Sequence, residues 1–485
     1  MFLDFRQPAA PENFEFDICI VGAGPAGISL ALALAGTGAR IGLLESGGYD
    51  GDAGTQALYE GESVGFQHTG LDTCRLRFLG GSSNCWNGWC APLEDIDFEH
   101  RDWVPYSGWP ITLASLAPWY AGARTLCEVT SHGNSEALWE KLPLHRQPFN
   151  AERVRTPFWQ YSPPTRFGRR YRSRLADAAG VTVLLHANAI AIETTEQANR
   201  ASGIAIATLE GKRGHVSAGI IVIACGGIEN ARLLLASNER VPSGLGNSHD
   251  QVGRYFMEHP YAISGYVVSR NFDHLSTVEK KIDGARLESV FCTGIETQRK
   301  FQVLNSMALV WPDEEVAHLF SWGRGALPDI PDGFSAYALM SQSEQSPNPA
   351  SRIRLSGKRD HFGRSLAKMD WRLLPIDKKT VRIQMEQTGA EFARLNLGRL
   401  KLADWLLDGD ALWGMGGGNH HMGTTRMGDD PGSSVVDRNC KVHGLDNLYV
   451  AGSSVFATSG WANPTLTIVA LSLRLADELK AKLPA

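Results

Sequence analysis

The run DICIVGAGPAGISLALALAGTGARIGLLE near the start of the chain constrains the fold more than any other stretch. It predicts a short apolar strand over residues 17–21, a glycine-rich turn over residues 22–27, a helix of small residues over residues 28–36 and a second strand over residues 40–45. Strand, helix and strand in this order form the βαβ unit of a parallel sheet. The chain is therefore expected to begin with a dinucleotide-binding unit.

The turn has the spacing G-x-G-x-x-G at Gly22, Gly24 and Gly27. The first glycine permits a tight turn, the second lets a pyrophosphate approach the backbone, and the third lets the helix lie close to the sheet. The N–H groups at the helix start, beside Pro25 and Ala26, are expected to hold the phosphates. A glycine turn without a ligand is the alternative, and the spacing alone does not separate FAD from NAD.

Glu45 ends the second strand about 20 residues after the first glycine, where its carboxylate can accept hydrogen bonds from a ribose diol. Ser46 follows it and is a further predicted contact. The run ACGGIENARLLLAS from residue 224 is another strand, Gly-Gly turn and helix, matching the opening unit in kind. Later strand-like runs supply more expected cofactor contacts: Ala189, Ala224, Gly226, Gly452 and Ser453.

A loop rich in Gly, Ser and Trp, FLGGSSNCWNGWCAP, lies within the irregular stretch from residue 49 to about residue 92. Such a loop can approach a planar ring system through its backbone while aromatic side chains shield one side. The alternative is a tryptophan-rich loop that only covers the core. Cys85 could be a nucleophile or a flavin attachment point, although a packed thiol is the simpler reading. The predicted contacts are Gly80, Gly81, Ser82, Ser83, Asn84, Cys85 and Trp86.

Two segments near the C-terminus carry the candidate catalytic residues. In GNHHMGTTRMG, His420 and His421 precede a Gly-Thr turn, and in SGWANPTLTI, Asn463 and Pro464 have the positions of an N-cap and a first helical residue before Thr465. An imidazole is the expected base for a hydroxyl proton, and an amide beside it can orient the same hydroxyl. A metal site is not expected, because consecutive side chains diverge and no Asp, Glu or Cys stands at ligand spacing.

The composition bears on partners and location. The 485-residue chain has a formal net charge of -5 without a basic stripe, which argues against nucleic acid or anionic membrane as a partner. No apolar run reaches the ~20 residues that span a bilayer, and residues 1–17 lack a signal-peptide pattern. The eight cysteines are scattered without a CxxC pair, which favours free thiols in a reducing cytoplasm, and export together with a signal-bearing partner is the alternative.

Taken together, these segments resemble the glucose-methanol-choline (GMC) oxidoreductase family. The resemblance rests on GAGPAG with Glu45, the GGSSNCW loop, ACGGIENARLLLAS, GRYFMEHP at residues 253–260, and HHMGTTRMG, LYVAGSS and NPTLTI, in family order. It implies an FAD enzyme whose isoalloxazine lies between two domains. The family's H-x-x-G-T pattern falls on His420, which the resemblance makes the base, with His421 as its neighbour.

The family's second catalytic position, a His or Asn before the last helix, falls on Asn463. An asparagine there is similar to the sugar-oxidising branch, which includes pyranose oxidases, bacterial glucose dehydrogenases and glycoside 3-oxidases. Part of that branch binds its flavin covalently through a histidine in G-G-x-x-x-His-Trp. Cys85 occupies that place here, so non-covalent FAD is expected, with a cysteinyl bond as the alternative.

The fold class implied is α/β: a Rossmann-like FAD-binding domain with an inserted α+β substrate domain. Alternating stretches such as YAISGYVVS and KFQVLNSMALV predict an antiparallel sheet in the inserted part. The expected FAD-binding domain comprises residues 1–105, 176–261 and 401–485, and the expected substrate domain comprises residues 106–175 and 262–400.

The expected reaction is the oxidation of a secondary or primary alcohol, most simply a sugar or glycoside hydroxyl, with a proton passing to His420 and a hydride to flavin N5. His421, Trp89 and Trp461 are the predicted substrate contacts, and Trp86 and Trp322 could also stack on a pyranose face. Oxygen, a quinone or a redox partner protein could reoxidise the flavin. The alternatives are a non-sugar alcohol, a lyase that keeps FAD structurally, and a flavin-binding electron-transfer or scaffold subunit.

Overall fold

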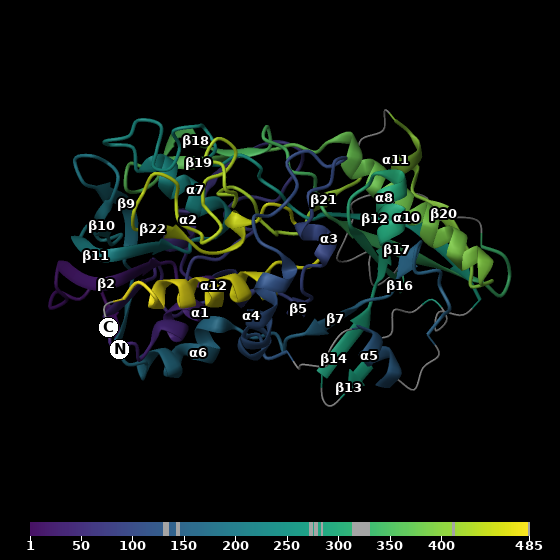
Figure 1. Cartoon of the computed structure of the whole chain (residues 1–485), viewed down its shortest axis with the longest axis horizontal. Helices are drawn as coiled ribbons and strands as arrows, with labels where there is room; N and C mark the ends of the chain where they lie inside the picture. The colour runs from purple at the N-terminus through teal and green to yellow at the C-terminus, as the bar shows by residue number, and fades with distance from the viewer. Residues whose placement is uncertain are drawn as a thin grey trace.

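The predicted βαβ unit is present at the N-terminus of the computed structural model (Figure 1). It consists of β2 (Asn13–Val21), α1 (Pro25–Leu34) and β3 (Ile41–Leu44). Strand β2 begins earlier than its apolar run because residues 13–16 also pair with a neighbouring strand. The structure describes residues 1–129, 135–141, 146–270, 275, 280–282, 285–312, 330–409 and 413–483.

The first sheet is parallel at its centre. Its order is β1 (Phe2–Asp4), β8 (Val181–Leu185), β3, β2, β11 (Arg213–Ile223), β10 (Ala201–Ala207) and β9 (Asn188–Thr194), with β22 (Leu448–Val450) paired to the end of β11. Only the β9–β10–β11 pairings are antiparallel. Figure 1 shows α1, α6 (Phe167–Ala176) and α12 (Thr465–Lys480) below β2 and β11, and α7 (Gly226–Ala236) above them. These helices bury the apolar strands, as a parallel sheet requires.

The second large sheet is antiparallel and lies beside the first along the long axis of the molecule (Figure 1). Its strands are β20 (Arg399–Leu402), β12 (Pro260–Ser269), β17 (Ser335–Ser343), β16 (Ser306–Pro312), β15 (Phe291–Thr293) and β6 (Val154–Arg155), with β21 (Gly416–Gly417) paired to β12. The long helix α10 (Pro375–Arg394) packs on it. The strand β12 is buried over almost its whole length, and it carries the chain from the first sheet into the second.

The stretch from residue 49 to residue 92 is more regular than the sequence suggested. It contains α2 (Ala53–Ala57), β4 (Gly61–Gly65), the 3-10 turn η1 (Gly81–Asn84) and β5 (Trp89–Cys90). Strand β4 pairs with β19 (Ser365–Trp371), which also pairs with β18 (Arg352–Arg359); β5 joins β7 (Phe158–Tyr161), β14 (Ala285–Ser289) and β13 (Lys280–Ile282). These partners come from distant parts of the chain, so local periodicity cannot reveal them.

The remaining elements are α3 (Asp95–Phe98), α4 (Leu113–Leu126), α5 (Ser135–Lys141), α8 (Ile295–Phe301), α11 (Asp404–Leu407) and the 3-10 turn η3 (Ser453–Val455). The expectation of a mixed α/β fold is confirmed. The division into residues 1–105, 176–261 and 401–485 against 106–175 and 262–400 stays a prediction. In the part of the chain that the structure describes, no helix has both the length and the apolar character that crossing a bilayer requires.

Two glycines of the first turn have different roles: Gly27 is needed for packing of the helix, and Gly24 leaves space for the cofactor. A Cβ at Gly27 would lie 1.9 Å from the carbonyl oxygen of Gly22, whereas a Cβ at Gly24 would meet nothing within 4 Å. Gly27→Ala should therefore destabilise even the flavin-free protein, by about 1–3 kcal/mol, because α1 must move away from the turn. Gly24→Ala should leave the flavin-free protein as stable as wild type and weaken FAD binding, because the new methyl group occupies the phosphate approach.

Urea unfolding of the flavin-free variants and titration with FAD check both statements. Equal stability of Gly27→Ala and wild type would show that the close contact at the turn is not needed.

Candidate active site

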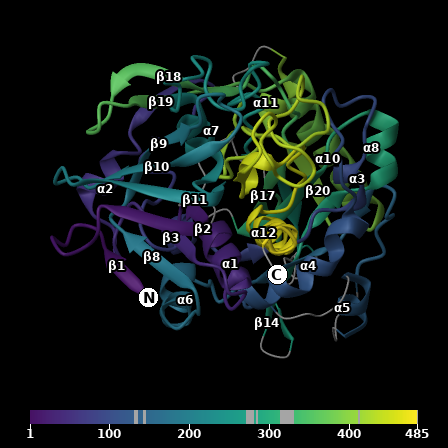
Figure 2. The ribbon, with the colours of Figure 1, turned by 60° about the vertical axis from the view of Figure 1, so that its left-hand side comes forward.

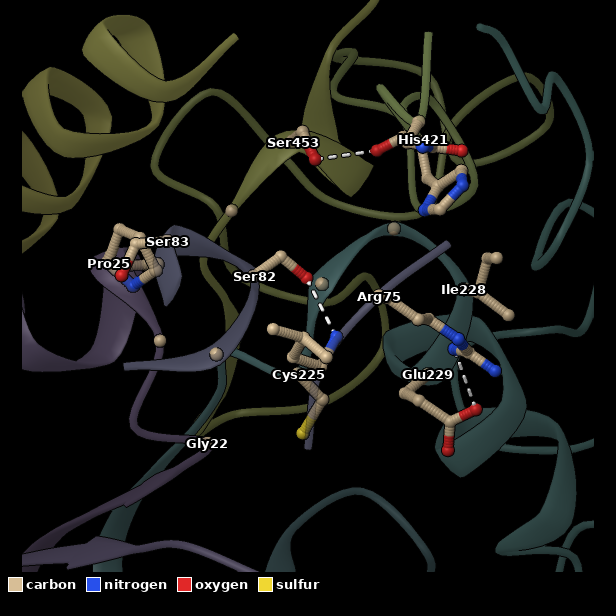
Figure 3. A pocket seen from close by; sticks show the side chains of 18 of the residues that line it. Gly22, Pro25, Arg75, Ser82, Ser83, Cys225, Ile228, Glu229, His421 and Ser453 are labelled. Carbon is tan, nitrogen blue, oxygen red and sulfur yellow. Dashed lines mark hydrogen bonds and ion pairs between the residues drawn. The ribbon is translucent and has the colours of Figure 1, made fainter. Parts of the chain in front are cut away.

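A cavity of about 510 Å³ lies where the carboxyl ends of three parallel strands meet the second sheet. Val21, Leu44 and Ala224, at or just after the ends of β2, β3 and β11, line one side of it, and Tyr261 of β12 lines another. Figure 3 shows Gly22 and Pro25 on one side of this cavity and the Arg75–Glu229 pair on the other. Ligands of open parallel sheets bind at this edge.

Most residues predicted from the sequence line this cavity: Gly22, Gly24, Pro25, Ala26, Glu45, Ser46, Gly81, Ser82, Ser83, Cys85, Trp86, Trp89, Ala189, Ala224, Gly226, His420, His421, Gly452, Ser453, Asn463, Pro464 and Thr465. Four others do not: Gly27, Gly80, Asn84 and Trp461. The Asn84 amide instead donates to the carbonyl oxygens of Leu79 and Gly81. Trp461 is buried beside Trp159, and Trp322 falls outside the described residues.

The glycine turn fits a dinucleotide. Gly22 has a φ of 105°, and a Cβ there would lie 2.7 Å from the carbonyl oxygen of Ala224. The first turn of α1 has no side-chain cap, so its N–H groups face the cavity without competition from the chain. Glu45 accepts N–H groups from Ala23 and Gly47, one on each oxygen, which holds its carboxylate at the cavity wall with lone pairs left for a diol.

His420 is held by hydrogen bonds that select one tautomer. The Nε2 atom of His259 lies 2.9 Å from the carbonyl oxygen of Gly460, which can only accept, so His259 carries its proton there. Burial lowers the pKa of His259, and its neutral ring therefore has an acceptor at Nδ1. That atom lies 2.9 Å from Nδ1 of His420, which must be the donor. The remaining atom, Nε2 of His420, is unprotonated.

Asn463 provides the second polar group beside this lone pair. Its Nδ2 atom lies 3.3 Å from Nε2 of His420, and its Oδ1 atom accepts a hydrogen bond from Gln342 at 3.1 Å. The expectation that Asn463 caps the last helix is wrong, since α12 begins at Thr465 with Pro464 as the capping residue and no side-chain cap bond. The Asn463 amide instead forms hydrogen bonds with Gln342 and His420, which come from other parts of the chain.

A buried carboxylate, Glu258, holds the loop that carries the histidines. Its Oε2 atom accepts N–H groups from His259, Gly418 and His420 at 2.9–3.1 Å. Burial alone raises its pKa, but the hydrogen bond from His68 and the nearby His421 outweigh burial and lower the pKa of Glu258 to about 2. The carboxylate therefore stays ionised beneath His420.

The sequence pattern indicates no role for Glu258, His259 or Gln342. Glu258 and His259 lie in GRYFMEHP, a segment that contributes only to the family resemblance. An acidic residue and a histidine before a proline were the available signal. Gln342 lies in the middle of an ordinary β-strand pattern and offered none.

His68, Cys74 and His421 place their ligand atoms within 4.8 Å of one another, a grouping that sequence spacing did not indicate. Hydrogen bonding accounts for His68, since its Nδ1 and Nε2 atoms lie 2.8 Å from the carbonyl oxygen of Thr69 and 3.0 Å from Glu258. Burial alone lowers the pKa of His68, but the Glu258 carboxylate raises it overall. Both neighbours of the ring can only accept, so the two contacts favour the protonated ring. The absence of a metal stays a prediction.

The electrostatics of His420 predict a flat pH profile. Burial, followed by the adjacent His259, lowers the pKa of His420 to about 3. The base form is present whenever the pH exceeds that value, so the rate of substrate-dependent flavin reduction should stay constant between pH 8 and pH 5. A histidine of ordinary pKa would lose about thirtyfold over that interval. Anaerobic stopped-flow measurements test this, and a descending limb near pH 6.5 would contradict it.

Comparisons with known proteins agree with this geometry. Residues 17–249 match the family model described as FAD dependent oxidoreductase, and residues 347–472 match the one described as GMC oxidoreductase. The fructose dehydrogenase large subunit of Gluconobacter japonicus is 28% identical over 64% of this chain. The match covers only 56% of the length of that protein. The 2-methyl-1,2-propanediol dehydrogenase of Mycolicibacterium austroafricanum is 25% identical over 96% of both chains.

Two further similarities support less, because one covers a short part of the chain and the other concerns the fold alone. A C-glycoside 3-oxidase of Microbacterium trichothecenolyticum is 35% identical over 26% of this chain and 24% of its own length. A structure of formate oxidase from Aspergillus oryzae covers 98% of this chain and 99% of its own, with a TM-score of 0.60 and 15% identity, and shows the fold alone. The glycine turn and the two family matches agree: residues 17–249 carry an FAD-dependent oxidoreductase domain, and residues 347–472 carry the C-terminal domain of the GMC oxidoreductases.

Proposed function

We propose that this chain oxidises a hydroxyl group of a sugar or glycoside, with His420 as the base and Asn463 as the group that orients the hydroxyl. The observation that carries the proposal is the unprotonated Nε2 atom of His420, paired with the Asn463 amide at the cavity wall. FAD bound in the cavity would accept the hydride that leaves the carbon bearing this hydroxyl group. The residues described above supply the proton transfer and the positioning.

Each step on the protein side follows from the hydrogen bonds. The substrate hydroxyl donates to Nε2 of His420 and accepts from Nδ2 of Asn463, replacing the long 3.3 Å contact between those two atoms. When Nε2 takes the proton, Nδ1 keeps its own proton and its bond to His259. The new positive charge is opposed by the ionised Glu258, which already binds the His420 backbone N–H.

The choice of a sugar rests on the aromatic wall and on the relatives. Trp89 lines the cavity and stacks on Trp159, with ring centroids 4.4 Å apart. Trp86 also lines it, and such rings can stack on a pyranose face. Among the relatives described above, one is named for fructose and one for a C-glycoside. A non-sugar alcohol is the second candidate, because a relative that matches along almost the whole chain is named for a propanediol.

Anaerobic bleaching of the flavin by a panel of monosaccharides, glycosides and simple alcohols tests the proposal. Bleaching by a sugar or glycoside supports it, bleaching only by simple alcohols favours the second candidate, and no bleaching by any alcohol favours a lyase that keeps FAD structurally. Admission of air to the reduced protein then separates reoxidation by oxygen from reoxidation by a quinone or a partner protein.

The variant His420→Ala should keep the flavin spectrum and reduce the bleaching rate by at least about a hundredfold, because the hydroxyl proton loses its acceptor. His443→Ala is a matched control: this histidine is about 20 residues further along the chain and bonds Ser434 and the Gly428 carbonyl rather than cavity residues. Unchanged bleaching in His420→Ala would remove His420 from the role of base.

We further propose that the FAD is bound non-covalently. Partial burial raises the pKa of the Cys85 thiol, whose Sγ atom donates to the carbonyl oxygen of Ser82 at 3.3 Å. A protonated thiol that points into its own turn is a poor nucleophile. Precipitation of the protein with acid should therefore leave all the yellow flavin in the supernatant, and flavin retained in the pellet, lost again in Cys85→Ser, would establish a cysteinyl bond.

A cytoplasmic location is also part of this proposal. All eight cysteines are free, and six of them are buried. Free thiols of this kind persist in a reducing compartment.

A further inference from the structure

The turn between β18 and β19 brings an arginine to the wall of the cavity, far along the chain from every predicted site residue. Figures 1 and 2 both show this hairpin beside β9 and α7. The carboxylate of Asp360 accepts the backbone N–H groups of Phe362 and Arg364, which fixes the turn. The Arg364 side chain then lines the cavity.

Arg364 has donors to spare. Its Nη1 atom donates to the carbonyl oxygen of Ala189 at 2.8 Å. Its Nε and Nη2 atoms are shielded from solvent and have no hydrogen-bond partner within the described structure. Leaving the donors of a charged group buried and unpaired is costly, so a ligand with acceptor atoms is expected to complete the site.

The neighbours of Arg364 show at which end of the cavity its free donors lie. Ala189 lies two residues after Ala187, whose N–H donates to the carbonyl oxygen of Glu45 at 2.9 Å. Both alanines and Glu45 line the same cavity as Arg364. The guanidinium therefore lies at the end where Glu45 is placed to bind the ribose of a dinucleotide.

The charges around this end are not balanced. Glu229 pairs with Arg75 and Arg232 at 3.0 Å and with Arg77 at 3.6 Å, and Asp360 pairs with Arg232. With Arg364, four guanidinium groups thus face the carboxylates of Glu229, Asp360 and Glu45, which leaves one positive charge in excess. Arg75 and Arg77 also pack over the Tyr59 ring, whereas Arg364 has no such contact among the described residues. Burial, then repulsion from Arg232, lowers the pKa of Arg364 to about 10.

We propose that Arg364 binds the adenosine-diphosphate half of FAD, donating from Nε and Nη2 to acceptors of its phosphate or adenosine groups. A diphosphate supplies acceptors for the two unpartnered donors of Arg364 and negative charge for the uncompensated positive charge of the cluster. Arg364 is thereby a residue that recognises the nucleotide half of the cofactor and takes no part in the chemistry at His420. This inference rests on the FAD site of the proposed function and is independent of the substrate.

The test is the affinity of flavin-free protein for nucleotides, measured by quenching of flavin fluorescence and by competition. Arg364→Met should weaken FAD binding by about 10- to 100-fold and weaken competition by ADP and AMP in parallel, while binding of riboflavin is unchanged. Loss of competition by ADP and AMP but not by adenosine assigns the donors to phosphate, and an equal loss with adenosine assigns them to the nucleoside. Unchanged FAD affinity would overturn the proposal.

Two further variants distinguish loss of the Arg364 contacts from a general folding defect. Arg354→Met changes an exposed arginine on β18 of the same hairpin and should bind all nucleotides as wild type does. Arg364→Lys keeps a positive charge but has one nitrogen instead of three, so it should remain at least about tenfold weaker than wild type for FAD. Full recovery in Arg364→Lys would show that charge alone suffices and would refute the assignment of Nε and Nη2.

These measurements are separate from turnover. Failure of every sugar to bleach the flavin would contradict the proposed substrate and leave the nucleotide affinities of Arg364→Met unaffected. Normal FAD affinity in a well-folded Arg364→Met would contradict the inference and leave sugar oxidation intact.

Discussion

The close meeting of three parallel strands at Gly22 is the constraint on which the rest of the site depends. The N–H of Gly22 donates to the carbonyl oxygen of Leu44, and the N–H of Ala224 donates to that of Val21. The backbone of Gly22 comes so near to Ala224 that no side chain fits between them. Because the strand ends are drawn together here, α1 starts with free N–H groups at the cavity, and Glu45 reaches the same wall from β3.

A second centre of order is the Glu258 carboxylate, which joins segments from three parts of the chain. It binds the His68 ring, the backbone of His259 and the backbone of the loop that carries His420. An ionised group in a buried place is stable only when its lone pairs are filled, and here four donors fill them. The same carboxylate that orders the loop also places a negative charge beside His420, the base of the proposed reaction.

The sequence predicted those features that depend on neighbours along the chain. A glycine turn between a strand and a helix is a local requirement, and so is an acidic residue at the end of the following strand. The mixed α/β fold and about half of the cavity lining followed from such local patterns. The prediction that Asn463 caps α12 is wrong because tertiary partners compete for the side chain: Gln342 and His420 bind its amide. The Asn84 amide bonds carbonyl groups of its own turn, and its contact with the cofactor stays a prediction.

The sequence by itself determined that the cofactor is a dinucleotide and which residue types are available for chemistry, because a glycine turn between a strand and a helix is recognised from neighbours along the chain. Only the tertiary structure decided which nitrogen of His420 is free, since that follows from a relay through His259 to the Gly460 carbonyl, atoms that meet only in the fold. It likewise decided that Arg364 reaches the Glu45 end of the cavity. Proton positions and charge balance depend on what lies within a few ångströms, and folding brings those partners from distant segments of the chain.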